Sequence, residues 1–328
     1  MRRTWAPFVA ILTIALVISG CGDSEGDSSS PDKVTYVTAF GAVGRDAFAW
    51  VAQEKGYFRE AGLDVTIQLG AATGENLKVL AAGRAQFAHV DLTGAWILAG
   101  KGESKDIRAI AAVHQQSLVS IVALEGSGIT QPKQVEGRKI GAATGSVNQL
   151  LFPAYAKLAG IDPTKVQWFN APPAQLPTLL ASGRVDALST FLIGVKGLEK
   201  AAGGKKATVL PYSKYLPELF GNGILAPVSI TRDRPDLARR FRDAALKGLQ
   251  YTLDHPEEAA QILKKAQPAA DVTAAVGEIT LMAPYVKTSG VIDRKRVTDA
   301  IATLEGVGLI PPGLTPDSVV DFNLAPTG

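Results

Sequence analysis

The chain has 328 residues but only one cysteine, Cys21, and three histidines. One thiol forms no internal disulfide and excludes a metal site built from several cysteines. No stretch is rich in lysine or arginine, and the formal net charge is only +3, so nucleic acid is not expected as a partner. An H-E-x-x-H zinc motif is also absent. We therefore expect no metal, no other cofactor and no enzymatic activity.

A long hydrophobic run is missing too, because the apolar stretch at residues 6–18 is shorter than the roughly 20 residues of a membrane-spanning helix. Two arginines precede this stretch, and Ile18-Ser19-Gly20-Cys21 follows it. This order is typical of a cleaved export signal. The tetrapeptide resembles a bacterial lipobox, whose cysteine is acylated and becomes the new N-terminus. We predict a signal peptide at residues 1–20 and lipidation of Cys21; an ordinary secretory signal with a chance cysteine is the alternative.

Residues 22–32 contain no apolar side chain large enough to join a core. We therefore predict a flexible tether at residues 21–33 with an end-to-end distance of about 20 Å. Without residues 1–20 the chain carries 32 basic and 31 acidic residues. The remaining segment of about 300 residues is long for one compact core and favours two lobes.

Strand and helix patterns alternate after the tether. Strands are predicted at 34–40, 64–69, 87–90 and 108–114, helices at 46–55 and 75–82, and a short helical unit at 58–63. Gly56 and Gly83 stand where a left-handed residue ends a helix. This alternation predicts an α/β protein with mostly parallel sheets.

Part of the pattern repeats. Leu-Ala-Ala-Gly-Arg at residues 80–84 reappears as Leu-Ala-Ser-Gly-Arg at 180–184, and a short strand is expected after each. This similarity predicts two lobes of related topology. A second repeat, Gly-Ala-Ala-Thr-Gly at 70–74 and 141–145, has different spacing to the following helix and cannot occupy the same topological position.

Two segments are expected to cross between the lobes. Residues 115–117 precede a strand at 119–124, and residues 221–223 precede a strand at 224–230. We predict lobe I at 34–117 and 224–328, lobe II at 118–223, and a two-strand hinge that allows closure. Helices predicted at 236–253, 257–265, 271–286 and 293–307 would complete lobe I.

Residues 51–65, V-A-Q-E-K-G-Y-F-R-E-A-G-L-D-V, carry the clearest family resemblance. They resemble the first βαβ unit of ABC-importer solute-binding proteins for sulfonates, taurine, nitrate and pyrimidine precursors of thiamine, which are related to fungal thiamine-pyrimidine synthases. Residues 80–84, 135–141, 180–187 and 255–259 extend the resemblance over nearly all of 34–322. It implies a two-lobed periplasmic-binding-protein type II-like fold. Each lobe would be a mixed, mostly parallel sheet flanked by helices, with the ligand in the cleft between the lobes.

Ligands of open α/β sheets bind beyond the carboxyl ends of the strands. The candidate ligand-binding residues near these ends are Phe40, Gly41, Arg45, Thr73, Asp91, Gln115, Thr144, Gly145, Ser146, Asn170, Asp186 and Phe191. Phe40 and Phe191 are candidates for stacking, and Arg45 for binding an anion. Residues 144–146 open a helix, whose free N–H groups can bind a ligand.

Several of these candidates also have a purely structural explanation. Ser146 fits a helix N-cap, while Asp91 and Asp186 fit turn caps. Arg45 could pair with the neighbouring Asp46, and Gln115 could hydrogen-bond between strands. Tryptophans 50, 96 and 168 are expected in the core, and the three histidines are too scattered to form a metal site.

The sequence thus predicts an exported, lipid-anchored, monomeric solute-binding protein at the outer face of the cytoplasmic membrane. The resemblance implies an ABC permease and ATPase as partners and a small organic solute, either a thiamine-precursor-like pyrimidine or a sulfonate or taurine. Without a cluster of basic residues, a neutral or weakly polar heterocycle is favoured. An exported enzyme related to the thiamine-pyrimidine synthases is one alternative, although the chain lacks their cysteine-rich iron motif. A ligand-sensing lipoprotein is another.

Overall fold

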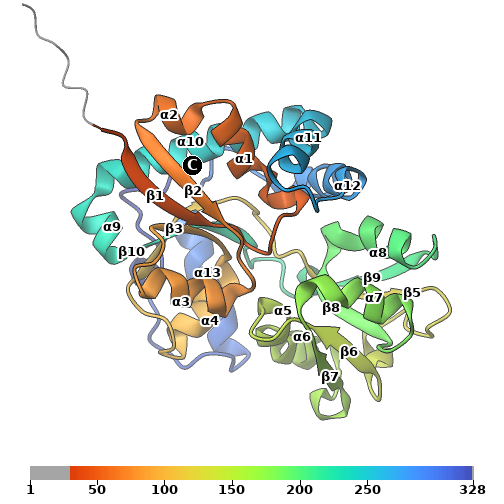
Figure 1. Ribbon diagram of the computed structural model, residues 1–328. Coiled ribbons are helices and arrows are strands. Elements are labelled where there is room, and N and C mark those ends of the chain that lie inside the picture. The colour runs from red at the N-terminus through yellow and green to blue at the C-terminus, as the bar shows by residue number, and fades with distance from the viewer. Residues whose placement is uncertain (1–29, 327–328) are drawn as a thin grey trace, which may run out of the picture. The chain divides into compact units, whose positions relative to one another are not determined.

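The computed structural model describes residues 30–326, and the colours of Figure 1 follow this part of the chain. Cys21, the predicted signal peptide and most of the predicted tether lie outside the described residues. Within 30–326, no helix combines the length and the apolar character that crossing a bilayer requires.

The first of two five-stranded sheets combines the first four strands of the chain with the last one, β10, which follows the second sheet in the sequence. It contains β1 (Asp32–Val37), β2 (Leu63–Gln68), β3 (Phe87–Asp91), β4 (Ile107–Ala112) and β10 (Asn222–Pro227) in the order β2-β1-β3-β10-β4. β1 is parallel to β2 and β3, whereas β10 is antiparallel to β3 and β4. The last strand in the sequence is therefore internal to the sheet.

The second sheet has the same pattern. It contains β5 (Val119–Leu124), β6 (Lys139–Ala142), β7 (Gln167–Asn170), β8 (Ala187–Phe191) and β9 (Ala207–Pro211) in the order β7-β6-β8-β5-β9. β6 is parallel to β7 and β8, and β5 is antiparallel to β8 and β9. β3 and β8 hold equivalent places, so the related topology predicted from the repeat is confirmed.

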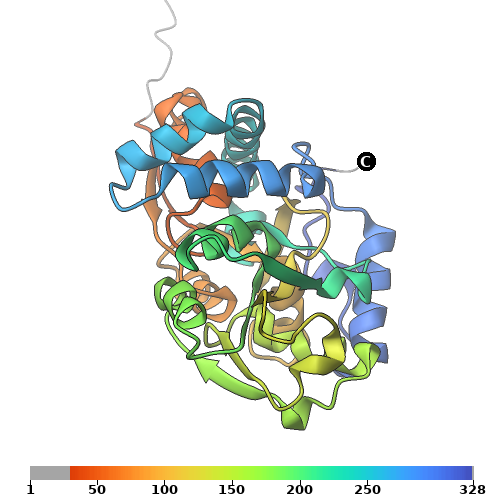
Figure 2. The ribbon, with the colours of Figure 1, turned by 90° about the vertical axis from the view of Figure 1, so that its right-hand side faces the viewer.

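Helices flank both sheets, as Figures 1 and 2 show. Below, each sheet together with its helices is called one half of the protein. The half with the first sheet contains α1 (Ala47–Glu54), α2 (Tyr57–Glu60), α3 (Thr73–Ala81), α4 (Leu92–Gly100), α9 (Val228–Asp233), α10 (Pro235–Asp254), α11 (Pro256–Ala266), α12 (Val272–Met282) and α13 (Arg294–Gly306). Those of the second half are α5 (Val147–Leu150), α6 (Phe152–Ala159), α7 (Leu176–Ala181) and α8 (Val195–Ala201). α3 and α7 end just before Gly83 and Gly183, which have φ of +67° and +69°. The predicted helix stops are thereby confirmed.

Several predicted elements end earlier than expected, and several observed elements, α4 among them, were not predicted. The strand expected at 224–230 stops at Pro227, which has no N–H to continue the ladder, and α9 follows. The helix expected at 271–286 ends at Met282, because Pro284 has no N–H to donate to the carbonyl one turn earlier, and a 3₁₀ turn (Ala283–Tyr285) follows. Helix α4 directly follows β3, where the sequence analysis predicted no element.

The two connections between the sheets run beside each other. The amide of Ser117 donates to the carbonyl of Leu219 (2.8 Å), and the amide of Gly221 donates to that of His114 (3.1 Å). The two Gly-Ala-Ala-Thr-Gly loops follow β2 and β6, which are not equivalent strands, as expected. They nevertheless meet, because the amide of Gly74 donates to the carbonyl of Gly145 (3.4 Å).

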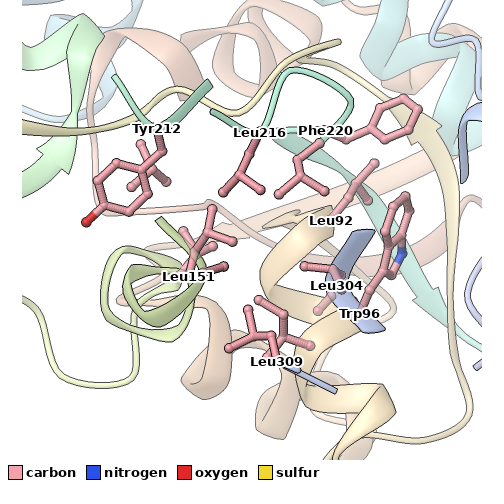
Figure 3. Packing of buried hydrophobic residues seen from close by; sticks show 14 of the residues in the cluster. Leu92, Trp96, Leu151, Tyr212, Leu216, Phe220, Leu304 and Leu309 are labelled. Atoms are coloured by element: carbon pink, nitrogen blue, oxygen red, sulfur yellow. The ribbon is translucent and has the colours of Figure 1, made fainter. Parts of the chain in front are cut away.

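One apolar cluster joins elements that pack on both sheets (Figure 3). Its labelled members are Leu92, Trp96, Leu151, Tyr212, Leu216, Phe220, Leu304 and Leu309, all of them buried. Leu92 and Trp96 come from α4 and Leu304 from α13, whereas Leu151 joins α5 to α6. Burial of these side chains stabilises the arrangement in which the two halves touch.

A candidate ligand-binding site between the two sheets

Two cavities adjoin each other where the carboxyl ends of strands from the two sheets face one another. Their volumes are about 10 Å³ and about 580 Å³. Phe40, Arg45 and Phe191 line both, so the cavities are neighbouring compartments of one site. The smaller has room for about one water molecule. The larger lies within the range of about 300–1,000 Å³ that is typical of pockets enclosing drug-sized ligands.

The small cavity contains polar atoms that have no protein partner. Asp91 is the last residue of β3 and caps α4, since its Oδ1 accepts from the amide of Gly94 at 2.8 Å. Its other oxygen, Oδ2, is buried without a hydrogen-bond partner, and so is the hydroxyl of Ser146 at the start of α5. Leaving such groups unpaired costs free energy, so the cavity is prepared for a ligand group or a water that bonds to them.

Arg45 lies at the junction of the two cavities and is 3% exposed. Its guanidinium carbon lies 4.2 Å from the centre of the Phe191 ring and 5.4 Å from that of Phe40. Its Nε lies 3.6 Å from Oδ2 of Asp46. The aromatic faces and the Asp46 carboxylate hold the guanidinium in place, and they also compensate much of its positive charge.

Asp46 anchors this end of the site. Its Oδ1 accepts from the amide of Ala39 (2.8 Å) and lies 2.8 Å from Nδ1 of His89. Burial opposes ionisation, but His89 and Arg45 together hold the pKa of Asp46 below its usual range. The carboxylate therefore stays charged and fixes both Arg45 and the loop that carries Phe40.

Two further carboxyl groups flank Arg45. Burial raises the pKa of Asp91 to about 7, and burial raises that of Glu278 in α12 to about 7 as well. Glu278 lines the large cavity, and its Oε2 accepts from the amide of Arg45 (3.3 Å). One guanidinium thus faces the carboxyls of Asp46, Asp91 and Glu278. This balance of charges does not favour a strongly anionic ligand.

The structure brings two of the three histidines together, contrary to the expectation that all three are scattered. The ring centres of His89 and His114 are 6.0 Å apart, and both side chains are fully buried. Burial holds the pKa of His114 well below its usual value, so this imidazole is neutral. His255 instead packs on Tyr251. Within residues 30–326, no three or more histidine, cysteine or acidic side chains gather as metal ligands would.

The large cavity is mainly apolar. Its lining side chains come from the ends of β2, β7 and β8 and from α7 and α8, and they include Leu69, Pro172, Pro173, Leu176, Pro177, Leu188, Ile193 and Leu198. Leu69 is 53% exposed, one of two large hydrophobic side chains exposed in the described part of the chain. The polar side chains of this cavity are those of Arg45, Thr190 and Glu278.

Seven of the twelve predicted ligand-binding residues line one cavity or both: Phe40, Gly41, Arg45, Thr73, Asp91, Ser146 and Phe191. Thr144 and Gly145 lie exposed on the loop before Ser146. The other three point to protein partners: Gln115 Nε2 donates to the carbonyls of Ala112 and Val291, Asn170 accepts from Gln149, and Asp186 accepts from the amide of Lys139. Asp186 precedes β8 and thus lies at the opposite end of that strand from the cavities. Direct contact of any of the twelve with a ligand stays a prediction.

Several lining residues were not predicted. For Asn222, at the start of β10, the sequence predicts only a connection, and for Asn76 only a helix. The prolines at 172, 173 and 177 follow the carboxyl end of β7, so the rule that selected Asn170 would have selected this segment too. Glu278 has no local signal in the sequence, because the packing of α12 alone brings it to the site.

The raised pKa of Asp91 makes a testable prediction for stability. The unfolded chain ionises this carboxyl near pH 4, whereas the folded protein holds its proton up to about pH 7. The folded state therefore binds more protons between these values, and stability falls as pH rises from about 4 to about 7. Asp91→Asn keeps the acceptor for Gly94 and removes the ionisation. It should be more stable than the parent at pH 8, by up to about 4 kcal/mol, with a smaller difference at pH 4.5. Urea unfolding of both proteins at the two pH values measures this, and parallel pH dependence would contradict it.

The two facing α/β sheets and the cleft between them place the protein in the periplasmic-binding-protein class of folds, as predicted. The chain belongs to the family described as NMT1/THI5 like, whose model matches residues 46–259.

Individual relatives fit this assignment. The formylaminopyrimidine-binding protein of Halalkalibacterium halodurans is 24% identical over 267 residues, covering 80% of this chain and 79% of the relative. The 4-amino-5-hydroxymethyl-2-methylpyrimidine phosphate synthase of Legionella pneumophila is 24% identical over 66% of this chain and 68% of its own length. The alkanesulfonate-binding protein of Xanthomonas axonopodis pv. citri, solved with bound MOPS, superposes with a TM-score of 0.70 at 12% identity, covering 92% of this chain and 100% of that one.

Proposed function

We propose that this protein is the extracytoplasmic solute-binding component of an ABC importer and that it captures a small organic molecule in the cleft described above. It then acts as a monomer that delivers the solute to a permease and its ATPase. The observation that carries the proposal is the small cavity, in which Asp91 Oδ2 and the Ser146 hydroxyl are buried and unpaired between the two halves. The family, which contains solute-binding proteins, supports the same role.

The charges and the size of the small cavity favour a nitrogen heterocycle over a sulfonate. Arg45 is already paired with Asp46, and Asp91 and Glu278 add acidic groups. A cavity of about 10 Å³ has room for one amino group but not for a three-oxygen head group. An amino group would donate to Asp91 Oδ2, and the ring to which it is attached would lie against Phe40 and Phe191.

A binding role without chemistry also fits the composition of the site. Relatives bear the names of binding proteins and of pyrimidine phosphate synthases, so kinship alone favours neither. The only cysteine of the chain is Cys21, far in sequence from every lining residue. The Ser146 hydroxyl has no base within hydrogen-bond distance that could activate it. We therefore expect the solute to be released without chemical conversion.

The function is tested by thermal unfolding of the full chain in detergent with formylaminopyrimidine, an aminopyrimidine, taurine and nitrate. A ligand at one hundred times its Kd adds about 2.7 kcal/mol of stability, which raises the Tm by several degrees. We expect this shift with the pyrimidines and a smaller one, or none, with taurine and nitrate. Mass spectrometry of the incubated pyrimidine should find it intact. A shift with none of the four, or a converted compound, would overturn the proposal.

The location makes a separate prediction. If Cys21 is acylated, the protein is held at the outer face of the cytoplasmic membrane by at least two acyl chains, which bind stably. Replacing Cys21 with Ser should release most of the protein from the membrane fraction of its host. Immunoblots of the pelleted and soluble fractions measure this. Ser19→Ala, which keeps the cysteine, is the matched control, and a Cys21→Ser protein that still pellets would rule out the anchor.

A further inference from the structure

The large cavity is bigger than an aminopyrimidine needs. Its volume of about 580 Å³ is that of a pocket for a drug-sized ligand. Its walls are mainly apolar side chains and glycines, and they include three prolines, the rings of Phe40 and Phe191, and the exposed Leu69. A purely polar solute of pyrimidine size would leave most of this apolar surface in contact with water, which is unfavourable.

The two compartments have opposite character and a shared wall. The small one presents unpaired polar atoms and has room for a single small group, whereas the large one presents mainly apolar side chains, with Arg45, Thr190 and Glu278 as its polar ones. Because Phe40, Arg45 and Phe191 line both, a molecule with its polar group beside Asp91 must extend past the two rings into the large compartment. The site thus has a polar end and an apolar end.

From this arrangement we infer that the solute is amphipathic, with a small N–H-donating head beside Asp91 and Ser146 and a bulky apolar body that fills the compartment between β2, α7 and α8. The inference rests on the proposed function and specifies its substrate class. Burial of apolar surface supplies the affinity, and the head supplies the orientation. Each methylene that enters the apolar compartment should improve the affinity by up to about fourfold.

A homologous series of 4-aminopyrimidines with 5-alkyl chains from methyl to hexyl tests the inference by calorimetric titration of the full chain. The expected result is a Kd that falls with each added carbon, by tenfold or more from methyl to hexyl. A Kd that stays flat or rises along a series whose methyl member binds would overturn the inference and leave the proposed function standing. If no member binds, the inference falls, and the thermal-unfolding test with the four compounds decides whether the proposed function falls with it.

A variant that fills the compartment sharpens the test. Gly197 in α8 lines the cavity, and a Cβ placed on it meets no atom within 4 Å. Gly197→Leu should weaken binding of the hexyl compound by at least tenfold and change that of the methyl compound by less than about threefold. Gly306→Leu, at the end of α13, adds the same side chain at an equally open site outside the cavity and should change neither.

The rim residue provides a second variant that does not depend on filling the cavity. Leu69 is already exposed, so Leu69→Asn should leave folding intact while weakening the hexyl compound severalfold more than the methyl compound. If Gly197→Leu does not fold, as judged by circular dichroism, this variant decides. Equal effects on both compounds would show that the alkyl chain does not enter the compartment.

Discussion

Replacing Asp46 with alanine should lower the free energy of unfolding by about 3–5 kcal/mol, because it leaves a buried guanidinium without its carboxylate. Asp46 is fully buried, accepts from the amide of Ala39, and lies 2.8 Å from His89 and 3.6 Å from Arg45. Its loss also leaves the Ala39 amide unpaired, which adds to the cost.

Urea or guanidinium unfolding at pH 7 measures this change. Asp64→Ala, which removes an exposed aspartate from β2, is the control and should alter stability by less than about 0.5 kcal/mol. Asp46→Asn keeps an acceptor for the Ala39 amide but loses the charge, so its stability should fall between those of the parent and Asp46→Ala. A loss below 1 kcal/mol for Asp46→Ala would mean that Arg45 finds another partner.

Replacing Gly94 with leucine should weaken solute binding by about a hundredfold. Gly94 in α4 faces Val147 in α5, and a Cβ on Gly94 would lie 3.0 Å from Cβ of Val147 and 3.0 Å from Cγ2 of Thr73. A leucine therefore acts as a wedge between the two halves next to the small cavity. If only 1% of the molecules reach the arrangement in which the two halves touch, the apparent Kd rises about a hundredfold.

Titration with the solute identified by thermal unfolding measures the affinity, and solution scattering should find a larger radius of gyration for Gly94→Leu than for the parent. Gly306→Leu again serves as the control, because α13 can accept the side chain without contact. Gly94→Ala should have a milder effect. Unchanged affinity in Gly94→Leu would show that α4 and α5 need not approach each other for binding.

Local patterns were sufficient to predict most of the fold. Glycines that require positive φ marked the ends of α3 and α7, and the repeated segment predicted the equivalence of β3 and β8. The rule that ligands bind at strand carboxyl ends selected Phe40, Arg45 and Phe191, because these positions depend on strand direction alone. The same rule was applied wrongly to Asp186, which precedes β8 and so lies at the opposite end of that strand.

The rest of the site depends on packing that no local pattern encodes. Glu278 reaches the cleft because α12 lies almost against the backbone of Gly44, where a Cβ would be 2.3 Å from the carbonyl of Ala275. The pairing of His89 with Asp46 likewise joins residues 43 positions apart across β3 and the loop after β1. Such contacts follow from the three-dimensional arrangement of whole elements, so one sequence interpreted by itself does not reveal them.

The position of β10 within the first sheet has a consequence for biogenesis. β5 to β9 are contiguous in the chain, so the second sheet can form as soon as residues 119–211 are available. The first sheet must wait for residues 222–227, which separate β3 from β4. During synthesis or export the first sheet, although its first four strands are made earliest, therefore stays incomplete until β10 arrives. Until then β3 and β4 have unpaired edges that a chaperone would need to shield.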